Sequence, residues 1–172
     1  MGTLTYSTQM TNNLATPPVI NAKGSGLYRI PWNYTVATTA LVTTDVVQVC
    51  KIPAGSKVIL PLSVMKLSAD QGASTQVDIG HAAYVDKNGA TVAAVADALV
   101  NGYVASSTAV NSLIPATAAP VGTSVNTLGV MDFTDAVQDV IITLTCLDAG
   151  GTFDGDIADV YNGYFVVEYQ GK

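Results

Sequence analysis

Short runs rich in β-branched residues, each closed by a turn cluster, constrain the fold of this chain most strongly. Residues 45–52 (DVVQVCKI) form one such run, and Pro53-Ala54-Gly55-Ser56 closes it. Residues 57–67 form a second, longer run that Pro61 interrupts. Because proline donates no ladder hydrogen bond, this interruption predicts an edge strand or a bulge.

Further along the chain, apolar and polar residues alternate with the period of a half-buried strand. The alternation covers residues 74–79, then residues 137–147, and finally residues 160–170. In the second of these runs we expect one face to hold Val140, Ile142, Leu144 and Cys146. Between the first two runs, Asp86-Lys87-Asn88-Gly89 has the Asn-Gly pair typical of a hairpin turn.

About eight such strands joined by short turns predict an all-β fold, a two-sheet antiparallel sandwich or a barrel. One helix is expected over residues 92–101, with Gly102 as its stop signal. The residues that recur at helical spacing there are Val92, Val95, Ala96 and Leu99.

The first 30 residues differ from the rest of the chain. They are polar and rich in turn residues, such as Pro17-Pro18 and Gly24-Ser25-Gly26. They show neither the helical nor the strand periodicity of apolar residues. Such a segment cannot bury enough surface to fold alone. We therefore expect an extended N-terminal arm over residues 1–30 and a sandwich domain over residues 31–172.

Charged residues make up only 12% of the chain, whereas an ordinary soluble domain has about 25%. The surface is therefore expected to be largely neutral, which favours assembly with partners. The net charge is −6 and no segment clusters the basic residues. This argues against direct binding to nucleic acid or to anionic membrane. No secretory signal or membrane-spanning run is visible, so folding is expected in a cytoplasm.

The inventory of reactive side chains is small. His81 is the single histidine, no nucleophile-elbow motif occurs, and an enzyme is not expected. Cys50 and Cys146 lie in apolar runs. They are interpreted as buried reduced thiols, with an inter-strand disulfide as the alternative.

One loop could hold a metal. Residues 148–159 are rich in Asp and Gly, and calcium prefers several oxygen ligands on a flexible loop. The candidate ligands are Asp148, Asp154, Asp156 and Asp159. The spacing is not that of an EF-hand, and Asp and Gly are also ordinary turn residues. We therefore expect no cofactor, and calcium is the alternative.

A resemblance covers roughly residues 38–102 and the final strand. It rests on the run from Thr38 to Val49, on Ile52-Pro53-Ala54-Gly55-Ser56-Lys57-Val58-Ile59, on Ala69-Asp70-Gln71-Gly72, on Val77-Asp78-Ile79-Gly80 and on Ala96-Asp97-Ala98-Leu99-Val100-Asn101-Gly102. These segments resemble small virion proteins of tailed bacteriophages, several of which are head decoration (cement) proteins, and the resemblance implies a jelly-roll-like sandwich. The resemblance implies a structural protein on the capsid exterior, bound to the major capsid protein, stabilising it and forming a homotrimer.

The arm and the residues that follow it are the expected contact region. Trp32, between Pro31 and Asn33, could anchor the arm to the body or to a partner. The candidate contacts with the capsid or a neighbouring subunit are Tyr28, Arg29, Pro31, Trp32 and Tyr34. The alternatives are a carbohydrate- or receptor-binding module of a fibre or spike, which would use exposed aromatic residues, and another minor virion component.

Overall fold

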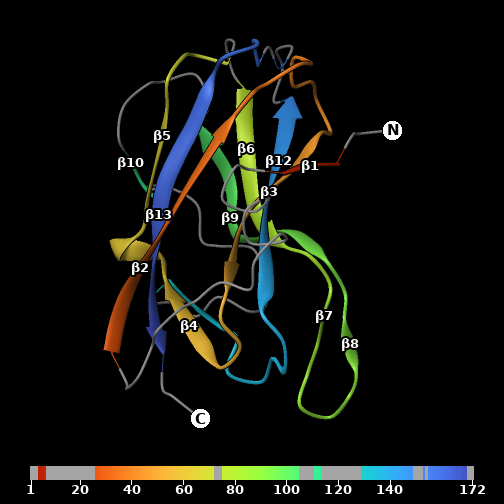
Figure 1. Ribbon diagram of the computed structural model, residues 1–172, viewed down its shortest axis with the longest axis vertical. Coiled ribbons are helices and arrows are strands. Elements are labelled where there is room, and N and C mark those ends of the chain that lie inside the picture. The colour runs from red at the N-terminus through yellow and green to blue at the C-terminus, as the bar shows by residue number, and fades with distance from the viewer. Residues whose placement is uncertain are drawn as a thin grey trace.

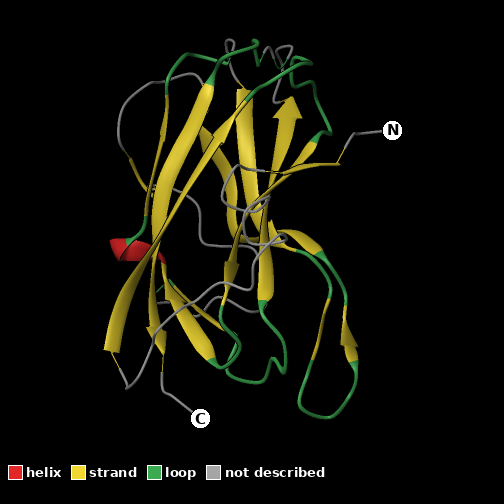
Figure 2. Ribbon diagram, viewed as in Figure 1, coloured by secondary structure: helices red, strands yellow, loops and turns green. Residues whose placement is uncertain are grey.

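Two β-sheets packed face to face form the body of the protein in the computed structural model (Figure 1). The structure describes residues 4–6, 26–71, 75–104, 111–113, 129–148, 153 and 155–169. Within these residues the only helical element is a single 3₁₀ turn, coloured red in Figure 2. No helix in the described part of the chain is long and apolar enough to span a membrane.

Sheet A has five strands in the order β1-β3-β12-β6-β9. Their bounds are Leu4–Tyr6 for β1, Val46–Ile52 for β3, Val140–Asp148 for β12, Thr75–His81 for β6 and Val95–Val104 for β9. Neighbours are antiparallel except β1, which runs parallel to β3.

Sheet B is built around β13 (Val160–Tyr169), which pairs along its whole length with β2 (Gly26–Thr35). On its other side β13 pairs with β4 and β5. The remaining bounds are Ser56–Ile59 for β4, Val64–Leu67 for β5, Asn111–Ser112 for β10 and Val130–Asp132 for β11. This arrangement confirms the predicted all-β, two-sheet sandwich.

The interruption predicted at Pro61 is a 3₁₀ turn, η1 (Leu60–Leu62), between β4 and β5. Both short strands pair with β13, and the register against β13 shifts by three residues between them. Ser63 completes the ladder at the gap. Its Oγ accepts a hydrogen bond from the Val166 N–H at 2.9 Å and donates one to the Ile59 carbonyl at 2.8 Å.

The core lies between the sheets and follows the predicted alternation. Val140, Ile142, Leu144 and Cys146 are all at most 1% exposed. Cys50 and Cys146 are both buried free thiols, so the reduced interpretation is confirmed over the disulfide. Burial raises the pKa of Cys146 to about 12 and raises that of Cys50 as well.

The helix expected over residues 92–101 is wrong. Most of this segment belongs to β9, which pairs antiparallel with the edge of β6. The register shifts twice along this pairing, and Ala98, Leu99 and Val100 are buried in succession rather than at helical spacing. The open edge of β6 supplies hydrogen-bond partners that override the local helical pattern of Ala and Leu.

The Asn-Gly turn predicted at residues 86–89 is confirmed as a hairpin. It joins β7 (Tyr84–Val85) to β8 (Thr91–Val92), and Gly89 has φ +79°. Asp86 holds the turn, because its Oδ1 accepts hydrogen bonds from the Asn88 and Ala90 amides. In Figure 1 this hairpin stands away from the two sheets.

Strand β2 crosses the expected boundary between arm and domain at residue 30. It begins at Gly26, and residues 26–30 already pair with β13. At the other end of the predicted arm, Leu4–Tyr6 pairs with β3. The rest of the predicted arm lies outside the described residues.

Candidate contact surface

The alternation along β2 divides the predicted contact residues between the core and the surface. Trp32 and Tyr34 are 2% and 6% exposed and face the core, where Trp32 stacks on Phe165 and Tyr34 packs against Tyr161. Their side chains are therefore not accessible to a partner. Arg29 and Pro31 point outward and are exposed, whereas Tyr28 is partly buried against the core.

The outward side chains of β2, β13, β4 and β5 line up in rows, because directly paired residues of antiparallel strands share a face. This surface, the sheet B face, consists of Leu27, Arg29, Pro31, Asn33, Lys57, Val64, Lys66, Asn162, Tyr164, Val166 and Glu168. One row runs Pro31–Tyr164–Val64, and another runs Asn33–Asn162–Lys66.

Arg29 of β2 and Tyr164 of the neighbouring strand β13 meet on the sheet B face. The Arg29 guanidinium carbon lies 4.8 Å from the centroid of the Tyr164 ring, a cation–π contact between β2 and β13. Arginine and tyrosine are the residue types most enriched at protein interfaces. With Asp132 of β11, which pairs with Lys57 and shares its face, this side of sheet B has three basic and two acidic residues, although the chain carries a net charge of −6.

At the centre of sheet A, even the side chains that point outward are buried. Gln48, Asp78 and Thr143 point away from the core, yet all three are at most 9% exposed. The Asp78 Oδ1 accepts the Gly102 N–H at 2.7 Å, and burial raises the pKa of this carboxyl. Of the two sheets, sheet B therefore offers the more accessible outer face.

Hydrogen bonds connect Asp156 and Asp159, at the end of the acidic loop, to the rest of the fold. The buried Gln71 accepts a hydrogen bond from the Tyr161 hydroxyl, and its Nε2 donates to Asp159 Oδ2 at 2.9 Å. The same Oδ2 accepts the Asp156 N–H at 3.1 Å. Asp156 is exposed, and the Asp154 residue and the Asp148 side chain lie outside the described part of the chain. Among the described residues, no group of three metal-ligating side chains occurs.

His81 is a core residue. It is 2% exposed and makes edge-on contacts with the rings of Tyr84 and Phe133, and its Nδ1 lies 2.9 Å from the Ala82 carbonyl. That geometry makes Nδ1 the protonated nitrogen of a neutral ring, and burial lowers the pKa of the imidazole. His81 thus anchors the base of the β7–β8 hairpin.

Sequence reasoning missed the extent of the sheet B face. Alternation was readable in Leu27-Tyr28-Arg29-Ile30, but the turn-rich residues before it placed the segment in the arm. Tyr164 lies in the alternating run at residues 160–170, and its outward direction follows once Phe165 is placed in the core.

Comparisons with known proteins leave the family open. No family model and no curated protein matches the chain. Among solved structures, the chain is similar to one described as "Cyanophage Pam1 capsid asymmetric unit", with 12% sequence identity and a TM-score of 0.46. The alignment covers 87% of this chain and 89% of that one.

Proposed function

We propose that this protein is a structural component of a tailed-phage virion that binds the outer surface of the capsid through its sheet B face and stabilises it. The observation that carries the proposal is this face itself. It has five exposed residues, Leu27, Arg29, Pro31, Asn33 and Lys66, and an Arg29–Tyr164 contact, on a protein whose sequence resembles phage decoration proteins over residues 38–102.

The chemistry of the face suggests what it meets. Arg29, Lys57 and Lys66 face outward together, with Glu168 and Asp132 as their acidic neighbours, and Lys57 lies 3.8 Å from Asp132. A partner surface with exposed carboxylates would complement this charge, and complementary charge chiefly raises the rate and specificity of association. The expected partner is the major capsid protein, and the binding should weaken as ionic strength rises.

Stabilisation follows from mass action. A protein that binds the assembled shell and not its dissociated subunits shifts the equilibrium toward the shell. A rigid sandwich suits this role, because little conformational entropy is lost when a preformed face docks. The predicted arm would add contacts across a seam between subunits by ordering on a neighbour.

The test is binding to capsids that lack this protein. Purified chain should co-sediment with such capsids and raise the temperature at which they disassemble, with less binding in higher salt. Absence of co-sedimentation at low salt would contradict the proposal. Binding of the purified chain to a glycan array would instead favour the carbohydrate- or receptor-binding alternative.

A further inference from the structure

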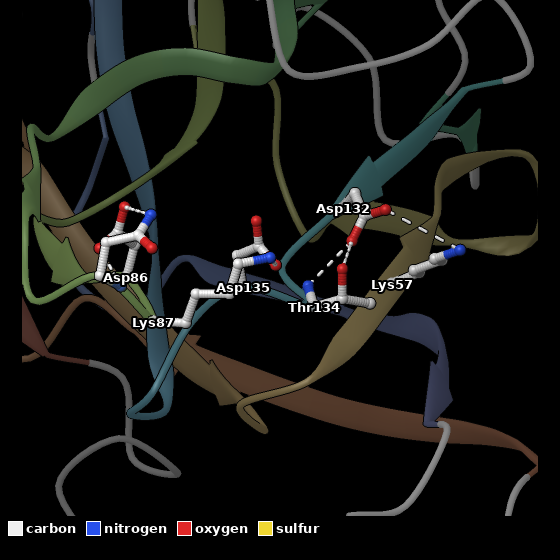
Figure 3. Close-up of polar contacts among 7 residues, drawn as sticks. Lys57, Asp86, Lys87, Asp132, Thr134 and Asp135 are labelled. Carbon is white, nitrogen blue, oxygen red and sulfur yellow. Dashed lines mark hydrogen bonds and ion pairs between the residues drawn. The ribbon is translucent and has the colours of Figure 1, made fainter.

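The β7–β8 hairpin has one protected edge and one open edge. On the β7 side, the Val85 carbonyl accepts the Val137 N–H at 3.0 Å, and Asp86 forms a bridge with Ala136. Lys87 reinforces this side through an ion pair with Asp135, with 2.6 Å between Nζ and Oδ1. Figure 3 shows the two side chains next to each other. The hairpin is therefore fixed to the loop after β11 along one edge only.

The hydrogen-bond pattern identifies the groups on the open edge. Val85 pairs with Thr91 and turns its carbonyl away from β8. In an antiparallel ladder the residue opposite must likewise turn its N–H and C=O away from the pair. The backbone groups of Thr91 therefore face outward, and alternation gives the same direction to those of Ala93. Both residues are exposed, and within the described chain neither has a partner on this edge.

This edge lacks the features with which proteins block unwanted strand pairing. Long edges usually have proline, charged side chains or bulges. Strand β2, whose pairing within the described residues is with β13, has two of these, Pro31 and Arg29. By contrast, residues 89–96 (GATVAAVA) contain no charge and no proline, and seven of these eight residues are exposed.

We propose that the β8 edge is a self-association site, where Thr91 and Ala93 pair antiparallel with the same residues of a second copy of this chain. A row of alternating N–H and C=O groups is best matched by another extended backbone. In a two-fold contact the edge meets itself, so any charge on it would face a like charge. The uncharged run at residues 89–96 meets this requirement on a chain with a net charge of −6.

The pairing would join two hairpins into a four-stranded ribbon, β7-β8 with β8-β7 of the second copy. Because the paired stretch is short, the contact should be weak and dependent on concentration. The inference does not rest on the virion role, since it concerns two copies of the free protein.

The test is sedimentation equilibrium of the full chain over a wide concentration range. The wild type should reach twice the mass of the species that Thr91→Lys forms, that is twice 17.7 kDa if this variant is a monomer. Thr91→Lys should weaken the association at least about tenfold. Thr39→Lys, the same change at an exposed position between β2 and β3, should associate like the wild type.

Amide hydrogen exchange provides a second readout. The amides of residues 91 and 93 should become protected as the wild-type concentration rises, and in Thr91→Lys they should need a concentration at least about tenfold higher for the same protection. Equal masses for wild type and Thr91→Lys up to about 1 mM, a range that includes weak interfaces, would overturn the proposal. Association without protection of these two amides would overturn it as well.

Discussion

The guanidinium of Arg29 lies over the ring of Tyr164, and this pair joins β2 to β13 on the outer face of sheet B. The contact holds two long side chains in place before any partner arrives. Preorganised side chains lose less entropy on binding than mobile ones. The pair therefore forms a preorganised part of the surface that we expect to contact the capsid.

Two serines each accept a hydrogen bond from a β13 amide, one in a buried and one in an exposed position. They give a matched test of how Ser63 completes the β13 ladder at η1. Ser63→Ala leaves the buried Val166 N–H without a partner and should cost about 1–3 kcal/mol in the free energy of unfolding. Ser68 also accepts an amide of β13, that of Val160, at 2.7 Å, but it is exposed. Ser68→Ala should cost less than about 0.5 kcal/mol. Urea denaturation measures both, and equal losses would contradict this account of Ser63.

Gly80 permits the close approach of β9 to β6. A Cβ at this position would lie 1.9 Å from the Val95 carbonyl oxygen and 2.3 Å from that of Ala96. Gly80→Ala should therefore lower the free energy of unfolding by about 2–3 kcal/mol or more, since backbone atoms must move. Gly89→Ala is the control, because no atom lies within 4 Å and only its positive φ is strained. Its cost should be about 1 kcal/mol. Thermal denaturation that ranks Gly89→Ala as the more damaging would contradict the prediction.

Because His81 is buried, we expect the protein to lose stability in mild acid. Burial lowers the pKa of the folded imidazole below its ordinary value of 6.5, so the unfolded chain takes up the proton more readily. The stability associated with the neutral ring is present above pH 6.5 and is lost as the pH falls toward the folded pKa. The raised pKa of Asp78 acts in the opposite sense, since protonation favours the fold.

Comparison with His81→Phe separates these two groups. The wild type should lose stability relative to the variant as the pH falls below 6.5, measured by urea denaturation at several pH values. A constant difference between wild type and variant across this range would contradict a buried neutral histidine.

Calcium should leave the protein unchanged. Asp159 Oδ2 already accepts two N–H groups, one from Gln71 and one from Asp156, and this network secures the loop. A ligand that binds only the folded state at a hundred times its Kd adds about 2.7 kcal/mol of stability. We therefore expect equal melting temperatures in millimolar calcium and in chelator. A clear rise in calcium would show that the acidic loop is a metal site.

The strands that were predicted correctly are those in which local pattern and packing agree. The run at residues 137–147 alternates cleanly, and Val140, Ile142, Leu144 and Cys146 all lie in the core. Residues 92–101 were assigned to a helix because helical spacing and Ala-rich composition coincide there. Only the neighbouring edge of β6, distant in the sequence, makes the segment a strand.

The sequence pointed to the segment at residues 28–34, but not to the directions of its side chains. Tyr28 to Tyr34 were singled out together, yet a strand sends alternate residues to opposite faces. Pairing with β13 decides that Trp32 and Tyr34 face the core while Arg29 and Pro31 face outward. Tyr164 belongs to β13, which lies more than 100 residues from Arg29 in the sequence. The Arg29–Tyr164 pair could therefore not be predicted from the sequence.

The most direct test of the central claim compares two charge reversals on opposite faces. Arg29→Glu changes the sheet B face, and Lys51→Glu makes a similar change on the outer side of sheet A. Both should keep the fold, checked by circular dichroism. In co-sedimentation with capsids that lack this protein, Arg29→Glu should bind at least about tenfold more weakly than wild type, and Lys51→Glu should bind normally. Normal binding by Arg29→Glu, or equal loss in both variants, would contradict attachment through the sheet B face.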